Sequence, residues 1–368
     1  MHRTFKICVV AALALCSGLP GRAEESEWLQ ADAPREWSFP RDHGAHPAYR
    51  TEWWYFTGNL ADDRGGVYGY QFTIFRVGVR TAPDPAEGGN PWAVRDLYLG
   101  HLAVSDGAGG TFHYADRLSR VGPGLAGAST KELEVWVLDW RAEGEGGAIH
   151  LTGGTEVFAL DLVLRPDKPV VLHGSQGLSR KGPRPGQASY YASLTSLSTS
   201  GTLRIAPGAI PVEVTGVSWF DQEFGSNQLA EDQAGWDWFS LHLGDGRDLM
   251  LYLLRRTDGT VEPASSGTLV EADGRAVHLE LGGFRVEVLD TWLSPRSGAR
   301  YPSRWRVTVP EHGVSLELAP LLANQELVTT GSTGVVYWEG AATGGGVSGS
   351  CRGYVELTGY AGALGGLF

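Results

Sequence analysis

The feature of this sequence that most limits its fold is the alternation of apolar and polar residues in short runs. The clearest runs span residues 67–75, 132–138, 158–164, 249–254, 284–289 and 305–309. Such alternation predicts β-strands with one buried face. Asp-Gly pairs, which favour hairpin turns, separate several runs, as at Asp245-Gly246 and Asp273-Gly274. Since no long stretch has helical periodicity, we predict an all-β protein of antiparallel sheets, either a sandwich or a barrel.

A segment rich in aromatic residues occurs twice. Residues 53–64 lead through an Asp/Gly/Arg turn into a strand ending at Arg76, and residues 236–247 lead in the same way to Arg255. An internal repeat separated by about half the chain predicts two related β domains.

The domain boundaries follow from composition. The residues before position 215 include Pro207, Gly208 and Pro211, which interrupt strand pairing. We therefore predict a signal peptide at 1–23, a linker at 24–38, an N-terminal β domain at 39–215 and a C-terminal β domain at 216–368.

The two aromatic segments have faces of different character, because alternate side chains of a strand point to opposite sides. One face of each copy mixes rings with hydrogen-bonding groups: Trp53, Tyr55, Thr57 and Asn59, and Trp236, Trp238, Ser240 and His242. The other faces are more apolar: Trp54, Phe56 and Leu60, and Phe239, Leu241 and Leu243. The apolar faces are typical of a dry core. The mixed faces predict a ligand cavity, or alternatively aromatic core layers with satisfied polar groups.

The first residues are typical of an export signal. A basic start at Arg3 and Lys6 precedes an apolar run of about ten residues, which is too short to span a bilayer. We expect cleavage near Ala23 and an exported protein, periplasmic or extracellular. The alternative is a membrane-anchored lipoprotein with its lipid on Cys16.

The cysteine content and the net charge argue against an intrachain disulfide and against a nucleic-acid partner. After cleavage Cys351 is the only cysteine left, so no intrachain disulfide forms. Removal of the three basic residues of the signal changes the formal charge from -12 to -15, and we expect no nucleic-acid partner.

Several blocks of the sequence resemble a known family. They are "DHGAHPAYRTEWWYFTGNL" from Asp42, "YGYQFTIFR" from Tyr68, "VSWFDQEFGSNQL" from Val217, "GWDWFSLHLGDGR" from Gly235, "YPSRW" from Tyr301, "NQEL" from Asn324, "YWEG" from Tyr337 and "GYVELTGY" from Gly353. In this order they resemble the AttH-like proteins related to carotenoid 1,2-hydratase. The resemblance implies two lipocalin-like β-barrel domains packed together. Bacterial members are labelled predicted secreted hydrolases, and relatives include carotenoid hydratases and fungal pericyclases.

Common catalytic motifs are absent from the sequence. The nearest approach to a serine nucleophile elbow, at residues 346–350, lacks its last glycine. His43 and His46 form an isolated pair, for which hydrogen bonding is expected more often than zinc binding. We predict neither a metal nor a cofactor.

Acid catalysis is the chemistry that the residues favour. Asp221 and Glu223 follow Trp219 at alternate positions, so an extended strand places all three on one side. A carboxyl group among aromatic rings has a raised pKa and can donate a proton. The resemblance matches Asp221 to the aspartate regarded as the acid in the hydratases, and their His/Trp pair is replaced here by Tyr190 and Tyr191.

The acidic residues also have a structural interpretation. Asp221 and Glu223 are equally expected to pair with Arg76 or Arg255 where the domains meet. Glu52, Glu339 and Glu356, each beside aromatic residues, fit the same buried ionic network. His101 alternates with leucines and is expected in the core slightly more often than in a pocket.

Two functions remain open. One is an enzyme that hydrates, cyclises or hydrolyses a hydrophobic lipid-, isoprenoid- or polyene-like molecule. The other is a non-catalytic lipid carrier, for which the family resemblance implies a membrane export system of the ABC transporter class as partner. The predicted catalytic residues are Asp221 and Glu223. The predicted ligand-binding residues are Trp53, Tyr55, Asn59, Gln71, Tyr190, Tyr191, Trp219, Trp236, Trp238 and His242.

Overall fold

The computed structural model describes residues 28–81 and 94–365. The predicted signal peptide and Cys16 lie outside the described residues. Within them every helix is a short 3-10 turn: η1 (Arg41–His43), η3 (Leu281–Gly283) and η4 (Pro310–His312). None is long and apolar enough to cross a membrane. The all-β prediction is confirmed.

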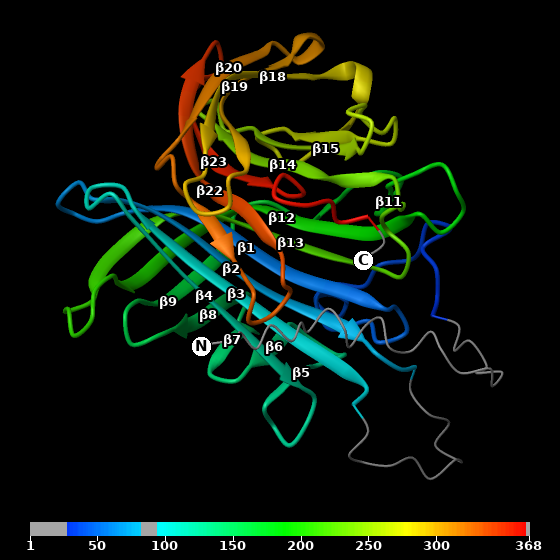
Figure 1. Ribbon diagram of the computed structural model, residues 1–368, viewed down its shortest axis with the longest axis horizontal. Helices are drawn as coiled ribbons and strands as arrows, with labels where there is room; N and C mark the ends of the chain where they lie inside the picture. Colours follow the sequence, from blue (N-terminus) through cyan, green and yellow to red (C-terminus); the bar gives the residue numbers. More distant parts are fainter. Residues whose placement is uncertain (1–27, 82–93, 366–368) are drawn as a thin grey trace, which may run out of the picture.

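The strands of the described residues form two antiparallel sheets that curl into barrel-like shapes, one stacked on the other (Figure 1). The first contains β1 (Thr51–Ala61), β2 (Val67–Gly78), β3 (Asp96–Asp106), β4 (Thr111–Arg120), β5 (Ala126–Ala128), β6 (Glu134–Val137), β7 (Trp140–Glu145), β8 (Ala148–Gly154), β9 (Ala159–Pro166), β10 (Val171–Leu172), β11 (Leu178–Arg180), β12 (Ala188–Arg204) and β13 (Val212–Gly225). The second contains β14 (Gln233–Leu243), β15 (Asp248–Arg256), β16 (Ser266–Val270), β17 (Ala276–Glu280), β18 (Arg285–Leu293), β19 (Arg300–Val309), β20 (Val314–Pro320), β21 (Glu326–Val328), β22 (Val336–Gly346) and β23 (Gly349–Leu357).

The two sheets repeat one pairing scheme. β1 lies between β2 and β13, the second and last strands of its sheet. β14 likewise lies between β15 and β23. The two aromatic segments are therefore equivalent strands of two related units, as the internal repeat predicts.

The strand pairing places the boundary between the two units after the predicted residue 215. β13 extends to Gly225 and pairs with β1 and β12 of the first sheet along its length. The chain passes to the second sheet only between Gly225 and Gln233. Pro207, Gly208 and Pro211 occupy the hairpin between β12 and β13 instead of a linker between domains.

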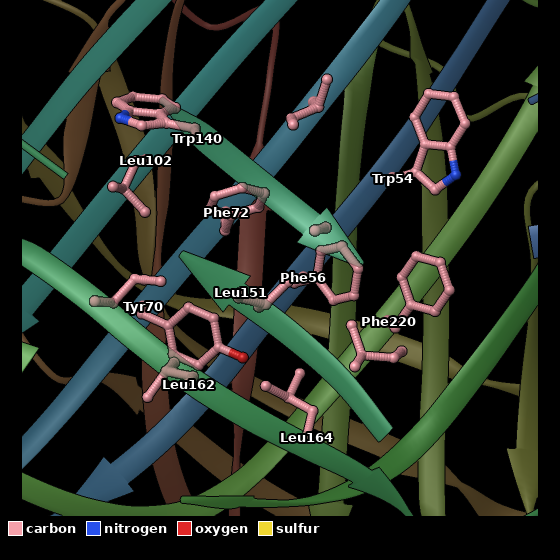
Figure 2. Packing of buried hydrophobic residues seen from close by; sticks show 14 of the residues in the cluster. Trp54, Phe56, Tyr70, Phe72, Leu102, Trp140, Leu151, Leu162, Leu164 and Phe220 are labelled. Carbon is pink, nitrogen blue, oxygen red and sulfur yellow. The ribbon is translucent and has the colours of Figure 1, made fainter. Parts of the chain in front are cut away.

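The interior of each barrel is filled by apolar side chains. Trp54 and Phe56 of β1 pack there with Phe72, Trp140 and Phe220, and Figure 2 shows these rings converging among leucines. The equivalent face of β14 contributes its apolar residues, Phe239, Leu241 and Leu243, to the second core. Both faces predicted to be dry are confirmed as core.

The outer faces of the two sheets meet at a junction. A third cluster there joins rings of both, including Tyr55, Trp219 and Trp238. The sheets approach closely where β2 crosses β22, since a Cβ atom placed on Gly69 would lie 2.4 Å from the Cβ atom of Ala341. Glycine at this position therefore permits the barrels to pack.

Candidate functional site

A cavity lies at the junction, between the outer faces of the two barrels. Its aromatic lining comes from six strands: Trp53 and Tyr55 of β1, Phe75 of β2, Tyr191 of β12, Trp236 and Trp238 of β14, Tyr252 of β15 and Tyr337 of β22. The two aromatic repeats therefore form opposing walls. Each presents to the cavity the mixed face that alternates with its core face.

Asp221 lies at the centre of the wall formed by the first barrel. In the register of the sheet it is opposite Tyr55 of β1 and Ser193 of β12. The Tyr191 hydroxyl donates to Oδ2 at 2.5 Å, Trp219 Nε1 donates to Oδ1 at 2.5 Å, and Ser193 Oγ also donates to Oδ1. Burial raises the pKa of Asp221 to about 7, although these donors oppose the shift. The carboxyl group therefore exchanges a proton near neutral pH.

Glu223 is paired with a lysine. The Nζ atom of Lys181, just after β11, lies 2.9 Å from Glu223 Oε1, which also accepts a hydrogen bond from Ser189 Oγ. The same Nζ lies 4.1 Å from the centroid of the Tyr252 ring. Burial lowers the pKa of Lys181, but Glu223, Tyr252 and Asp221 together outweigh this effect and the net shift of the pKa is upward. Glu223 therefore anchors an ammonium ion.

Glu356 provides a carboxyl group on the opposite wall. It lies beside Trp238 in the register of β14 and β23, and Trp236 Nε1 donates to its Oε2 at 2.6 Å. Burial raises its pKa to about 7. Tyr55 pairs with Asp221 in one repeat as Trp238 pairs with Glu356 in the other. The two acids thus occupy equivalent places in the two units.

Glu339 lies behind the lining residues. The Tyr55 hydroxyl donates to its Oε1, while its Oε2 is buried without a hydrogen-bond partner. Burial raises the pKa of Glu339 well above its usual range. Burial therefore favours the neutral, protonated form of this group.

The arginines expected to hold these acids lie elsewhere. Arg76 is 3.5 Å from Glu52 and 3.1 Å from Asp96 at the end of the first barrel. Arg255 is 2.9 Å from Asp237. The prediction of an Arg-Glu pair is confirmed by Arg76 and Glu52, but neither arginine contacts Asp221 or Glu223.

Seven of the predicted site residues line the cavity: Trp53, Tyr55, Tyr191, Asp221, Glu223, Trp236 and Trp238. Trp219 is fully buried behind them and acts through its hydrogen bond to Asp221. Tyr190, the neighbour of Tyr191, points to the opposite face of β12 and donates to the Ala33 carbonyl at 2.7 Å.

The other predicted residues lie outside the cavity, and one of them bonds across the junction. Asn59 Nδ2 donates to the Gly353 carbonyl of the second barrel at 3.1 Å. His242 Nδ1 lies 3.0 Å from Asp248. Gln71 is buried on β2, where its Nε2 donates to Thr73 Oγ1. These positions are farther along the strands than the cavity extends.

A buried histidine behind Asp221 was not predicted. His173 Nε2 lies 2.7 Å from Ser193 Oγ, and its Nδ1 lies 2.8 Å from Thr268 Oγ1 of the second barrel. Since Ser193 donates to Asp221, the fitting tautomer carries its proton on Nε2 and accepts at Nδ1. Burial lowers the pKa of His173 to about 3, so the ring is neutral.

His101 lies at another edge of the cavity. Its Nδ1 is 2.8 Å from the Tyr337 hydroxyl, and its Nε2 is 3.0 Å from Ser332 Oγ. Burial lowers its pKa to about 3. It therefore lines the pocket as a neutral hydrogen-bonding group.

His43 and His46 have separate partners. His46 Nδ1 lies 2.8 Å from Glu52, and His43 Nδ1 lies 3.4 Å from Gln222. Among residues 28–81 and 94–365, no three His, Cys, Asp or Glu side chains are arranged to hold a metal ion.

Comparison with known proteins matches nearly the whole described chain. A family model described as AttH-like matches residues 30–360. A crystal structure of an AttH from Nitrosomonas europaea is 35% identical, covers 89% of this chain and 99% of its own, and superimposes with a TM-score of 0.79. No curated protein matches this chain.

More distant solved structures share the fold. Kievitone hydratase from Nectria haematococca is 15% identical over 92% of this chain and 97% of its own, with a TM-score of 0.65. CghA is 12% identical over 85% of this chain and 89% of its own, with a TM-score of 0.51. At these identities the likeness is one of fold.

Proposed function

This chain belongs to the AttH-like family, and from that premise we propose that it acts on a hydrophobic small molecule bound between its two barrels. The molecule is of the lipid, isoprenoid or polyene class. The reaction is an acid-catalysed hydration or cyclisation of a carbon-carbon double bond, with Asp221 as the acid.

The observation that carries this proposal is a buried carboxyl group of pKa about 7 on the wall of an aromatic cavity. An isolated alkene needs a proton donor, and the cation that forms needs an apolar site with ring faces nearby. The name of kievitone hydratase, a distant relative in fold, supports hydration as the reaction class.

In the proposed hydration, Asp221 and one water molecule account for every proton that is transferred. The proton of neutral Asp221 forms a C–H bond with one alkene carbon through the π electron pair, and the other carbon becomes cationic. Water adds to that carbon, and the surplus proton of the bound water returns to the Asp221 carboxylate. The site ends in the state in which it began.

His173 and Ser193 position the acid in this proposal. Ser193 Oγ donates to Oδ1 of Asp221, and His173 lies 2.7 Å from the same hydroxyl. Neither side chain lines the cavity, so both act through Asp221.

The test compares wild type with Asp221→Asn on a panel of isoprenoid alcohols and polyenes. Substrate binding, followed by quenching of tryptophan fluorescence, is expected to be unchanged. Turnover, followed by mass spectrometry as the gain of one water or as an isomeric product, is expected to fall at least about 100-fold. Glu145→Gln, on the exposed end of β7, is the matched control. Equal turnover by wild type and Asp221→Asn would refute acid catalysis by this residue.

A carrier without catalysis is the second candidate. Both oxygens of Asp221 accept hydrogen bonds from neighbours, as in a carboxyl group whose role is structural. In that case the ligand leaves unchanged for a membrane export system, and Asp221→Asn alters neither binding nor the chemical identity of the ligand. Recovery of the same molecule before and after incubation with wild type would favour the carrier.

We also propose that the protein is exported. The support is the basic and apolar pattern of residues 1–23. Mass spectrometry of the protein from fractionated cells distinguishes cleavage near Ala23 from lipidation of Cys16. An intact N-terminus in the cytoplasmic fraction would contradict export.

A further inference from the structure

The charged side chains that line the cavity differ in whether they already have a partner of opposite charge. The charged side chains of the lining are Lys181, Asp221, Glu223 and Glu356. Lys181 is paired with Glu223 at 2.9 Å, so its charge is neutralised within the wall. Asp221 and Glu356 line the same cavity from equivalent positions of the two repeats. They accept hydrogen bonds from neighbouring donors, but in the part of the chain that the structure describes neither has an ammonium or guanidinium group within 4.0 Å. Two acidic groups of the lining are therefore available to pair with a cation, whereas the lysine of the lining is already paired.

The aromatic lining favours the same sign. A ring face attracts a cation because of its quadrupole, most strongly where water is excluded. The cavity already contains one example, since Lys181 Nζ lies 4.1 Å from the Tyr252 centroid and 5.2 Å from that of Tyr191. Trp53, Trp236 and Trp238 line the same space.

We propose that this cavity selects for positive charge on its occupant: an organic ammonium ion with an apolar chain binds more tightly than the matched alcohol, and the matched carboxylate binds least. The proposal rests on the ligand cavity of the proposed function and assigns its ligand class. An ammonium ion bound beside Asp221 or Glu356 pairs with that group in its ionised form, whereas a carboxylate bound there meets two acids and a lysine that is already paired.

The same preference connects to the proposed reaction. A stable ammonium ion resembles in charge the carbocation that forms when an alkene is protonated. A site that binds the ammonium ion well is one that stabilises the cation more than the neutral alkene. The preference would hold equally for a site that carries an amine without chemistry.

The experiment measures the affinities of octylammonium, octanol and octanoate by calorimetry near neutral pH. We expect octylammonium to bind about tenfold more tightly than octanol, and octanoate to bind least. Glu356→Gln should reduce the preference for the ammonium ion to about threefold or less, while exposed Glu145→Gln should leave it unchanged.

A second variant tests whether the cavity binds anions instead of cations. Lys181→Met removes the cation of the wall, so octylammonium affinity should be retained or rise. If octanoate binds best and Lys181→Met abolishes its binding, the cavity is an anion site and the proposal is overturned. Equal affinities for the three probes, or no binding of any of them, would overturn it as well.

The outcomes separate this inference from the proposed reaction. Octylammonium preference without turnover of any alkene supports the charge selectivity and contradicts the enzyme. Turnover with octanoate preference supports the enzyme and contradicts the selectivity.

Discussion

The inside of the first barrel and the junction between the barrels are built from the same strands and differ in what they can do. Trp54 and Phe56 of β1 point into a core of rings and leucines. Trp53 and Tyr55, their immediate neighbours, point into a space that also contains Asp221 and Glu356. Because the core supplies stability, the junction can hold carboxyl groups whose burial opposes ionisation.

The largest expected effect comes from comparing two substitutions on opposite faces of β1, one in the core and one at the junction. Phe56 is fully buried, and its ring centroid lies 4.3 Å from that of Phe220. Phe56→Ala should lower the free energy of unfolding by about 3–5 kcal/mol. Trp53→Ala, on the half-buried junction face, should lower it by only about 1 kcal/mol while weakening ligand binding. Urea unfolding and fluorescence titration measure the two effects, and equal losses of stability would remove the distinction between the faces.

The second effect is the pH dependence that the junction acids impose. Burial raises the pKa values of Asp221 and Glu356 to about 7, from 3.8 and 4.5. At pH values between the unfolded-state and folded-state pKa values, the two acids are protonated in the folded protein and ionised in the unfolded chain. The two acids therefore make the free energy of unfolding fall as pH rises. Asp221→Asn and Glu356→Gln should each flatten this fall by a few kcal/mol. Urea unfolding at several pH values, compared with Glu145→Gln, tests this, and parallel curves for all variants would contradict it.

The packing of the two barrels is tested by Gly69→Ala. The added Cβ would lie 2.4 Å from the Cβ of Ala341, so the sheets must separate. We expect a loss of about 1–3 kcal/mol, with weakened ligand binding. Gly282→Ala is the control, because its added Cβ meets nothing within 4 Å. Unchanged stability and binding in Gly69→Ala would show that this approach does not determine the junction.

The smallest expected effect concerns Glu339. Burial raises its pKa well above the usual range and so favours the neutral form, for which glutamine is a close substitute. Glu339→Gln should change the free energy of unfolding by less than about 1 kcal/mol at neutral pH. A loss of several kcal/mol would show instead that Glu339 is ionised in the folded protein.

The sequence predicts those parts of the structure that depend on local periodicity. Alternation identified the core face of β1, and the repeat identified β14 as its equivalent. The boundary at 215 failed because Pro207 and Pro211, which are typical of linkers, are equally suited to the turn of a hairpin within one sheet.

The site was predictable only where an acid and rings share a strand. Asp221 and Trp219 are two positions apart, and their contact follows from strand geometry. Lys181 and His173 lie in loops, and their partners are set by how loops cross the junction. Only the structure could therefore reveal the neutralised Lys181 and the bond from His173 to Ser193.

The central claim is that the ligand lies between the barrels and not inside one. The most direct measurement is photolabelling with a geranyl-type diazirine, followed by peptide mapping by mass spectrometry. We predict labels in peptides containing Trp53, Tyr191 and Trp238, reduced by an excess of unlabelled ligand. Labels confined to Phe72, Trp140 or Leu151, inside the first barrel, would contradict the account.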